Sequence, residues 1–259
     1  MEKIKILIRF PNKVMTAEEY LGYCKNFLLQ LRKIEPRFNS VYAWGRTTKS
    51  GRYLAEDLSD FNDVVLKQLS RGLAFINPEQ DDIRLHLHSK SYIDFHNSYS
   101  NTNSGQDEIS ISISCGSIDT APLYSFGVIT IYFSDDLQNK LDFNYLSSLF
   151  KLVINETNPL YASVGTFELN KLIQSRNHVN EEKYKENIEL GWLTYLKKPE
   201  LVQWLPEDVE YELIANGILF WLSKDRVLSN NTEAIKKGII IHNILEEHNL
   251  LSQNNYINK

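Results

Sequence analysis

A strand–helix–strand segment that occurs twice is the feature that most constrains the fold of this 259-residue chain. The first copy consists of an apolar run at 4–10, a helical stretch at 16–35 and a second apolar run at 41–45. The second copy keeps this order and nearly this spacing, at 127–133, 142–155 and 160–165. Such self-similarity indicates related structural units, and two copies are too few for a solenoid.

Capping and stop residues mark the two expected helices. Thr16 and Glu19 have the spacing of a capping box, and Pro36 prevents the first helix from continuing. In the second copy Asp142 is a candidate N-cap, and Asn158-Pro159 ends the helix. Each helix has an apolar stripe, which predicts that it covers one face of a sheet.

The rest of the chain indicates antiparallel strands. Residues 83–96 and 109–115 alternate between apolar and polar side chains, which is typical of strands with one buried face. We expect the polar stretch 97–107 to be the loop that joins them. Farther along, Asn216-Gly217 between two apolar runs predicts a hairpin, and a last helix is expected over residues 231–251.

These elements together predict an α+β fold made of two related lobes. In each lobe, helices are expected to cover one face of a mainly antiparallel sheet. The boundary is expected between residues 122 and 123, so that residues 1–122 form the N-terminal lobe and residues 123–259 the C-terminal lobe. We expect the two lobes to pack as one compact unit.

Composition excludes several classes of function. The two cysteines, Cys24 and Cys115, do not make a disulfide framework, and no charged-then-apolar leader begins the chain, so we expect a cytoplasmic protein. Cys24 falls on the apolar stripe of the first helix and is expected in the core. No apolar run approaches the roughly 18–20 residues of a membrane helix. A net charge of −5 gives no global footprint for nucleic acid.

Sequence motifs for catalysis and cofactor binding are absent. The chain has no Gly-x-Ser-x-Gly nucleophile elbow, no P-loop and no Gly-x-Gly-x-x-Gly run, so we expect neither an enzyme nor a cofactor. One alternative is a metal-dependent hydrolase, because four potential metal ligands share one parity of the expected strand: His86, His88, Asp94 and His96. The outermost of these four residues are more than about 20 Å apart on a straight strand, too far to share one metal ion. A solvated or partner-facing strand surface is therefore the favoured interpretation.

A candidate binding surface follows the first strand–helix–strand copy. Trp44 and Arg46 are residue types enriched at the centres of protein interfaces. The acidic residues Glu56, Asp57 and Asp60 follow and suit a basic partner. The structural alternative is that Trp44 packs beneath the first helix and that Arg46 pairs with a nearby acid.

Several short segments together resemble the immunity protein 52 family of bacterial polymorphic toxin systems. They are Gly191–Leu196, a Pro-marked turn, Ala215–Phe220, Asn230-Asn231 before the last helix, and, nearer the N-terminus, Ile34-Glu35-Pro36 and Tyr42–Gly45. The resemblance implies a cytoplasmic antitoxin that binds a cognate toxin domain, often a nuclease, and blocks it without catalysis. It assigns no catalytic residue.

An acidic inhibitor is compatible with this implication, since nuclease toxins hold phosphates and tend to be basic. The expected partner is therefore a basic toxin protein, with no nucleic acid and no membrane bound. The immunity protein thus has two alternatives: the metal-dependent hydrolase and a non-catalytic scaffold domain of a secretion system.

Overall fold

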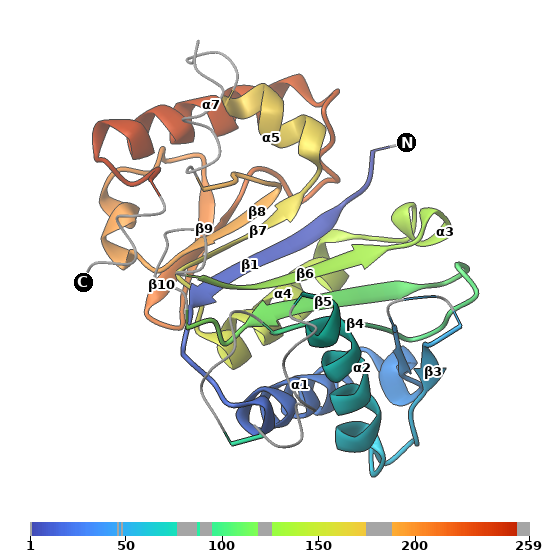
Figure 1. Ribbon diagram of the computed structural model, residues 1–259. Helices are drawn as coiled ribbons and strands as arrows, with labels where there is room; N and C mark the ends of the chain where they lie inside the picture. Colours follow the sequence, from blue (N-terminus) through green and yellow to red (C-terminus); the bar gives the residue numbers. More distant parts are fainter. Residues whose placement is uncertain are drawn as a thin grey trace. The chain divides into compact units, whose positions relative to one another are not determined.

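The computed structural model describes residues 2–45, 47, 49–76, 87–88, 95–118, 126–174 and 188–252 (Figure 1). The chain divides into two compact units. Unit 1 comprises Met1–Phe10 and Gln138–Lys259, and unit 2 comprises Pro11–Leu137. Both contain antiparallel strands and helices, which confirms the predicted α+β class.

The described residues of unit 2 form five antiparallel strands in the order β3-β2-β4-β5-β6. They are β2 (Tyr42–Ala43), β3 (Arg52–Tyr53), β4 (Phe95–Ser100), β5 (Ile109–Cys115) and β6 (Phe126–Phe133). In β5 every isoleucine is buried while the serines between them are half-buried. This is the period-two pattern that the sequence predicts for a strand with one core face.

Two long helices, α1 (Ala17–Leu31) and α2 (Phe61–Ile76), lie next to each other in unit 2 (Figure 1). The predicted capping box of α1 is present: the Glu19 N–H donates to Thr16 Oγ1, and the Thr16 N–H donates to Glu19 Oε2. The short 3₁₀-helix η1 (Pro36–Asn39) then begins at the predicted stop. Tyr20 of α1 donates its hydroxyl to the Ile113 carbonyl at 3.0 Å, which attaches the helix to β5.

The expected loop at 97–107 is partly wrong, because β4 continues through Ser100. Phe95 and Tyr99 are fully buried and continue the alternation, with the polar Asn97 buried between them. Their register against Cys115 and Ile111 of β5 supplies the backbone hydrogen bonds that hold this stretch as a strand. The polar composition of residues 97–100 therefore predicted a loop where the chain continues a strand with an aromatic core face. The first part of the alternating run, 83–86 and 89–94, lies outside the described residues.

Where the structure describes unit 1, it also has five antiparallel strands, in the order β1-β7-β8-β10-β9. They are β1 (Lys5–Pro11), β7 (Tyr161–Gly165), β8 (Leu193–Leu196), β9 (Glu210–Ile214) and β10 (Gly217–Trp221). The helices that the structure describes in this unit are α4 (Phe143–Thr157), α5 (Phe167–Gln174), the 3₁₀-helix η4 (Pro199–Gln203) and α7 (Thr232–Glu247). The short helix α3 (Asp135–Gln138) crosses the unit boundary. Asp142 caps α4 as predicted, by accepting from the Tyr145 N–H at 2.8 Å.

The predicted β9–β10 hairpin is present, but its turn lies one residue earlier than Asn216-Gly217. Ile214 pairs with Gly217, so the two turn residues are Ala215 and Asn216, with φ angles of 49° and 60°. Positive φ at both positions is what a type I′ turn requires. The first residue of β10 is a glycine because a Cβ atom at position 217 would lie only 2.5 Å from the carbonyl oxygen of Leu196. Gly217 is therefore needed for the close approach of β10 to β8, and not for the conformation of the turn.

Both predicted strand–helix–strand copies exist, as β1-α1-β2 and β6-α4-β7. Each copy is divided between the units, because β1 belongs to unit 1 while α1 and β2 belong to unit 2. Likewise β6 belongs to unit 2, and α4 and β7 belong to unit 1. The relatedness of the lobes and the division at 122/123 stay predictions.

Two helical glycines provide a test of the packing. Gly22, exposed in α1, has open space where a Cβ would stand, so Gly22→Ala should stabilise the protein by about 0.5–1 kcal/mol. Gly238 in α7 gains the same helix propensity, but its Cβ would meet Ile173 Cδ1 at 2.6 Å, and Ile173 is buried. Gly238→Ala should therefore destabilise by about 1–2 kcal/mol. Urea unfolding of both variants measures this, and equal shifts would contradict it.

Candidate functional site

Trp44, the centre of the predicted interface, follows β2 directly and is held by strand β4. Its backbone N–H donates to the Ser98 carbonyl at 2.9 Å, and its indole Nε1–H donates to Ser100 Oγ at 2.8 Å. The indole also meets the buried Tyr42 ring edge-on, with ring centroids 4.9 Å apart. These contacts fix the orientation of a half-buried indole at the sheet, so a partner would meet it without a large loss of side-chain entropy.

Tyr53 of β3 extends this cluster. Its ring meets Tyr42 edge-on at 5.1 Å, and 47% of its side chain remains exposed. The Tyr53 hydroxyl donates to Asn103 Oδ1 at 3.0 Å, in the loop between β4 and β5. We call Tyr42, Trp44 and Tyr53 the aromatic patch. Arg46, the predicted companion of Trp44, lies outside the described residues.

The three predicted acidic residues differ in their environment. Asp60 accepts from the Ala55 backbone N–H and from Arg52, both at 2.9 Å. Burial alone would raise the pKa of Asp60, but these bonds outweigh it and lower the pKa below its ordinary value. Asp60 therefore holds together the turn that leads into α2, and its carboxylate is already engaged.

Glu56 and Asp57 are exposed and better placed to meet a partner. Bonds from Ser59 lower the pKa of Asp57, and its Oδ1 accepts from the Ser59 N–H at 2.9 Å. The Glu56 carbonyl accepts from Arg32 Nη1 at 2.7 Å, which fixes the backbone of this turn and leaves the Glu56 carboxylate at the surface. The partner-binding role of these residues stays a prediction.

Of the four potential metal ligands, His86 and Asp94 lie outside the described residues. His88 is exposed, and its Nδ1 lies 2.7 Å from Glu18 Oε2. His96 is exposed on β4 and is in register with Ser114. Within the part of the chain that the structure describes, no three His, Cys, Asp or Glu side chains come together as a metal site.

The cysteines lie in the core of unit 2. Cys24 and Cys115 are 0% and 1% exposed, which confirms the predicted position of Cys24. Burial raises the pKa of the Cys24 thiol to about 12, although hydrogen bonds with Tyr20 and Tyr99 act in the opposite direction. A buried thiol that ionises so weakly is a poor nucleophile.

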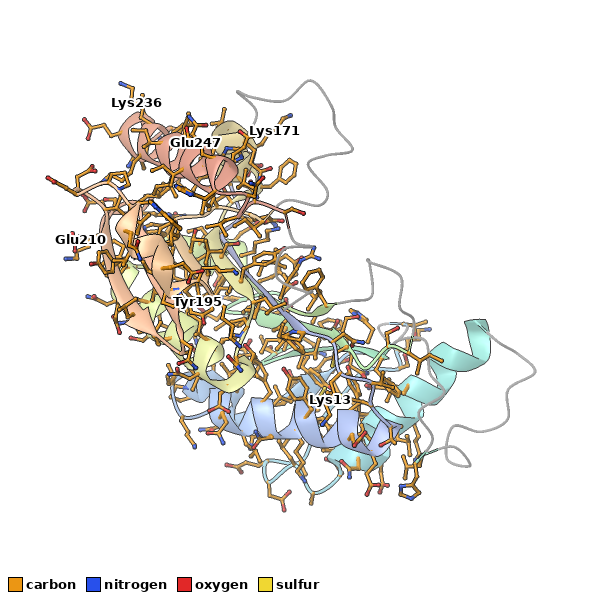
Figure 2. The ribbon with its side chains drawn as sticks, turned by 90° about the vertical axis from the view of Figure 1, so that its left-hand side faces the viewer. Lys13, Lys171, Tyr195, Glu210, Lys236 and Glu247 are labelled. Carbon is orange, nitrogen blue, oxygen red and sulfur yellow. The ribbon has the colours of Figure 1, made fainter. Side chains whose placement is uncertain are left out.

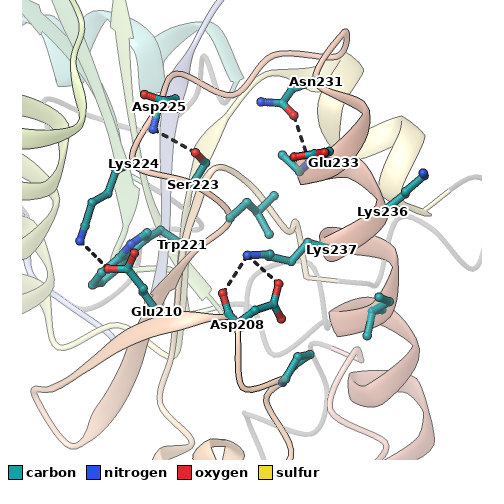
Figure 3. Close-up of a pocket in the computed structure, with 14 residues that line it drawn as sticks. Asp208, Glu210, Trp221, Ser223, Lys224, Asp225, Asn231, Glu233, Lys236 and Lys237 are labelled. Atoms are coloured by element: carbon teal, nitrogen blue, oxygen red, sulfur yellow. Dashed lines mark hydrogen bonds and ion pairs between the residues drawn. The ribbon is translucent and has the colours of Figure 1, made fainter.

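A pocket of about 600 Å³ lies in unit 1, between the β9–β10 hairpin and α7 (Figure 3). Its charged lining residues are Asp208, Glu210, Lys224, Asp225, Glu233, Lys236 and Lys237. Lys224 Nζ lies 2.5 Å from Glu210 Oε2, and Lys237 Nζ lies 3.0 Å from Asp208 Oδ2. Figure 2 shows Glu210 and Lys236 at the periphery of unit 1. Ion pairs thus occupy much of the lining, which includes neither histidine nor cysteine.

Sequence reasoning did not single out this pocket or Tyr53. The pocket forms because residues 206–210, 221–225 and 231–240 meet in three dimensions. The charged residues Glu207, Asp208 and Glu210 after the Pro-marked turn were the available signal, and Asp208 and Glu210 line the pocket. Tyr53 gave no signal, because its contact with Asn103 joins residues 50 positions apart.

Fold and site define an α+β protein, with antiparallel strands and helices in both units. Every described helix is too short or too polar to cross a lipid bilayer. Among solved structures, the chain is similar to "Pseudomonas aeruginosa T6SS protein PA0821", with a TM-score of 0.52 and 11% sequence identity. The match covers 94% of this chain and 72% of that chain. At this identity the likeness concerns the fold alone. No protein-family model and no curated protein sequence matches the chain.

The buried thiols give a direct test of the core of unit 2. In the folded protein neither Cys24 nor Cys115 should react with an aromatic disulfide reagent at about pH 8, because both are buried and Cys24 ionises only near pH 12. Both should react within seconds in denaturant. Rapid labelling of the native protein would contradict the described packing.

Asp60 predicts a pH dependence of stability. Its pKa is lowered in the folded state, so its contribution is complete above the unfolded value of about 4 and is lost as the pH falls through the lower folded value. Asp60→Asn should reduce the free energy of unfolding by about 1 kcal/mol at pH 7. The difference from wild type should shrink below about pH 4.

Urea unfolding at several pH values measures this difference. Asp63→Asn is the matched control, because Asp63 is an exposed carboxylate in the first turn of the same helix. A constant difference between wild type and Asp60→Asn across the acid range would exclude the Asp60 carboxylate as the source.

Proposed function

We propose that this chain is an immunity protein that binds and neutralises a cognate bacterial toxin domain in the cytoplasm. The observation that carries the secretion-system setting of this proposal is the fold likeness, over 94% of the chain, to a structure described as a T6SS protein. The immunity role itself rests on the resemblance of short segments to the immunity protein 52 family, although no family model matches the chain. Neither source supplies a catalytic role, and the proposed mechanism needs none.

The aromatic patch with Glu56 and Asp57 is the proposed centre of the toxin interface. Tyrosine and tryptophan are enriched among residues that dominate binding energy. Trp44 and Tyr53 are oriented by hydrogen bonds to Ser100 and Asn103, so they are ready for contact before the partner arrives. The exposed carboxylates of Glu56 and Asp57, which follow Tyr53 closely in the chain, attract a basic surface and raise the rate of association.

Inhibition would be stoichiometric occlusion of the toxin's active site. A stable inhibitor interface requires about 800 Å² from each partner, far more than the exposed parts of Trp44 and Tyr53 provide, since the Tyr42 ring is buried. The surrounding surface would therefore contribute complementarity, while the patch supplies much of the binding energy. A nuclease is the toxin class that best fits the acidic net charge of −5.

A second candidate is a non-catalytic scaffold domain of a secretion system, because the name of the similar structure fits that role equally. The two candidates differ in what they bind. An immunity protein binds one toxin domain, whereas a scaffold domain binds assembly components. Deleting the gene in a cell that still produces the partner should stop growth if the chain is an immunity protein, but not if it is a scaffold domain.

The deciding experiment is capture of partners from the native host with the full chain, followed by mass spectrometry and growth tests. A partner that stops growth when expressed alone, and is harmless beside this chain, supports the immunity function. Capture of assembly components without a toxic partner supports the scaffold. Toxicity that this chain does not relieve, despite binding, contradicts neutralisation.

Trp44→Ala should weaken binding of the captured toxin by about 30-fold, as expected for a central aromatic hot spot. Arg46→Ala should also weaken it. Tyr132→Ala is the matched control, because Tyr132 is 46% exposed on β6 of the same unit but lies outside the patch. Calorimetric titration measures affinity, and thermal unfolding verifies that each variant is folded. Unchanged affinity in folded Trp44→Ala and Arg46→Ala would show that the interface lies elsewhere.

A further inference from the structure

Strand β9 presents an open edge. It is the last strand in the order of unit 1 and, among the described strands, pairs with β10 alone. All five residues of β9 are in continuous antiparallel register, from Glu210 opposite Trp221 to Ile214 opposite Gly217. No bulge interrupts this register. Natural proteins usually block such edges with bulges, prolines or lysines, because an open edge accepts another strand.

The turn determines which backbone groups of β9 point outward. Ile214 and Gly217 flank the two-residue turn and form its hydrogen-bonded pair. Hydrogen-bonded and non-bonded pairs alternate along an antiparallel ladder, so Glu212 and Glu210 also bond to β10. Tyr211 and Leu213 therefore direct their N–H and C=O groups away from β10, toward the open edge.

The side chains of β9 also separate into two kinds. Tyr211 and Leu213 share one face and are 45% and 59% exposed. Glu210 and Glu212 lie on the other face, where each forms an exposed or half-exposed ion pair, with Lys224 and Lys151 respectively. Exposed pairs of this kind contribute only about 0–1 kcal/mol, so a cation from a partner can replace the lysine at little cost.

A second copy of this chain is a poor occupant of the edge. Two β9 strands that pair antiparallel over their whole length place Glu212 opposite Glu212. Shifts of the register by two residues pair only three residues of each strand, and one of the two shifts also places Glu210 opposite Glu212. Like charges directly opposite each other destabilise a strand pair. A strand with lysine or arginine at the corresponding positions meets these carboxylates favourably.

We propose that the open edge of β9 binds an extended segment of a partner protein in which apolar residues alternate with lysine or arginine. The segment adds to the sheet as a further strand by bonding to the outward backbone groups of Tyr211 and Leu213. Its apolar side chains lie beside Tyr211 and Leu213, and its cations lie beside Glu210 and Glu212. The proposal deepens the proposed function, on which it rests for the identity of the partner as the toxin.

The probe is a synthetic peptide of about eight alternating valine and lysine residues, titrated into the full chain and followed by amide NMR. Binding should protect the outward amides of Tyr211 and Leu213 from hydrogen exchange, while those of Glu210 and Glu212 are already protected by β10. A peptide of alternating valine and glutamate should bind at least tenfold more weakly. So should a valine–lysine peptide interrupted by proline, which cannot form a continuous strand.

Two variants locate the site. Leu213→Pro removes an outward N–H and should weaken peptide binding about tenfold; proline is tolerated where a strand's N–H faces solvent. Leu213→Lys leaves the backbone intact and adds a repelling cation at a position that is 59% exposed, so it tests the same edge without risk to the fold. Phe167→Lys is the control, since Phe167 is 67% exposed on α5.

Protection of the Tyr211 and Leu213 amides, lost in Leu213→Lys but not in Phe167→Lys, supports the proposal. Equal binding by all peptides, protection elsewhere, or dimerisation of the free chain through β9 overturns it. If the chain binds the peptide at β9 but does not relieve the toxicity of its captured partner, the proposed function is contradicted while the edge site is retained. Toxin neutralisation unaffected by Leu213→Lys contradicts the edge site as the toxin surface and leaves the function standing.

Discussion

Unit 1 depends on the antiparallel pairing of β1 with β7, which sets Lys5 opposite Gly165 and Arg9 opposite Tyr161. Ile6 and Ile8 of β1 are fully buried, as is Ile4 just before it, so this segment contributes a row of core side chains as well as backbone bonds. Every further strand of the unit is added outward from this pair, β8 on β7, then β10, then β9. Such contacts between distant parts of the chain form slowly, because loop closure precedes any gain. The unit is complete only when the first strand joins residues from the second half.

A close backbone approach continues this order beyond β7. A Cβ atom on Gly191 would lie 2.3 Å from the carbonyl oxygen of Val164, so only glycine allows the chain to enter β8 at this distance. The next residue, Trp192, is fully buried, and its indole donates to the Ser223 carbonyl at 2.7 Å. That bond ties the start of β8 to the residues that follow β10. The position of the outer hairpin, and with it the pocket and the open edge, therefore depends on one glycine and one tryptophan.

Local chemistry made much of the fold predictable. The Thr16 capping box, the Asp142 N-cap and the alternation of β5 are each decided by residues within one or two turns of the chain, and each is present. The position of the hairpin turn was predicted one residue late, because the close contact of Gly217 with Leu196 is not visible in local sequence. Strand β4 was predicted to end early for the same reason, since its continuation depends on pairing with β5.

The candidate sites were less predictable than the fold. Trp44 could be selected from its residue type and its position after a strand, but its bond to Ser100 joins residues 56 positions apart. The setting of Tyr53 likewise depends on a distant segment, because its hydroxyl bonds to Asn103 in the β4–β5 loop. Whether β9 is an edge or an inner strand depends on the complete strand order, which no local pattern contains. The alternation of Glu210, Tyr211, Glu212 and Leu213 fits either position.

The two surfaces solve different parts of the recognition problem. A half-buried tryptophan supplies binding energy through desolvation and depends on the shape of the partner. A strand edge supplies directional backbone bonds that almost any extended segment can satisfy, so its selectivity must come from side chains. Lysines on β9 would protect the edge against self-association but would also repel a basic partner. Glutamates at 210 and 212 oppose a second copy equally well, since like charges would face each other, and they favour a cationic strand. The sign of the edge charge, rather than its presence, therefore determines which strand can bind.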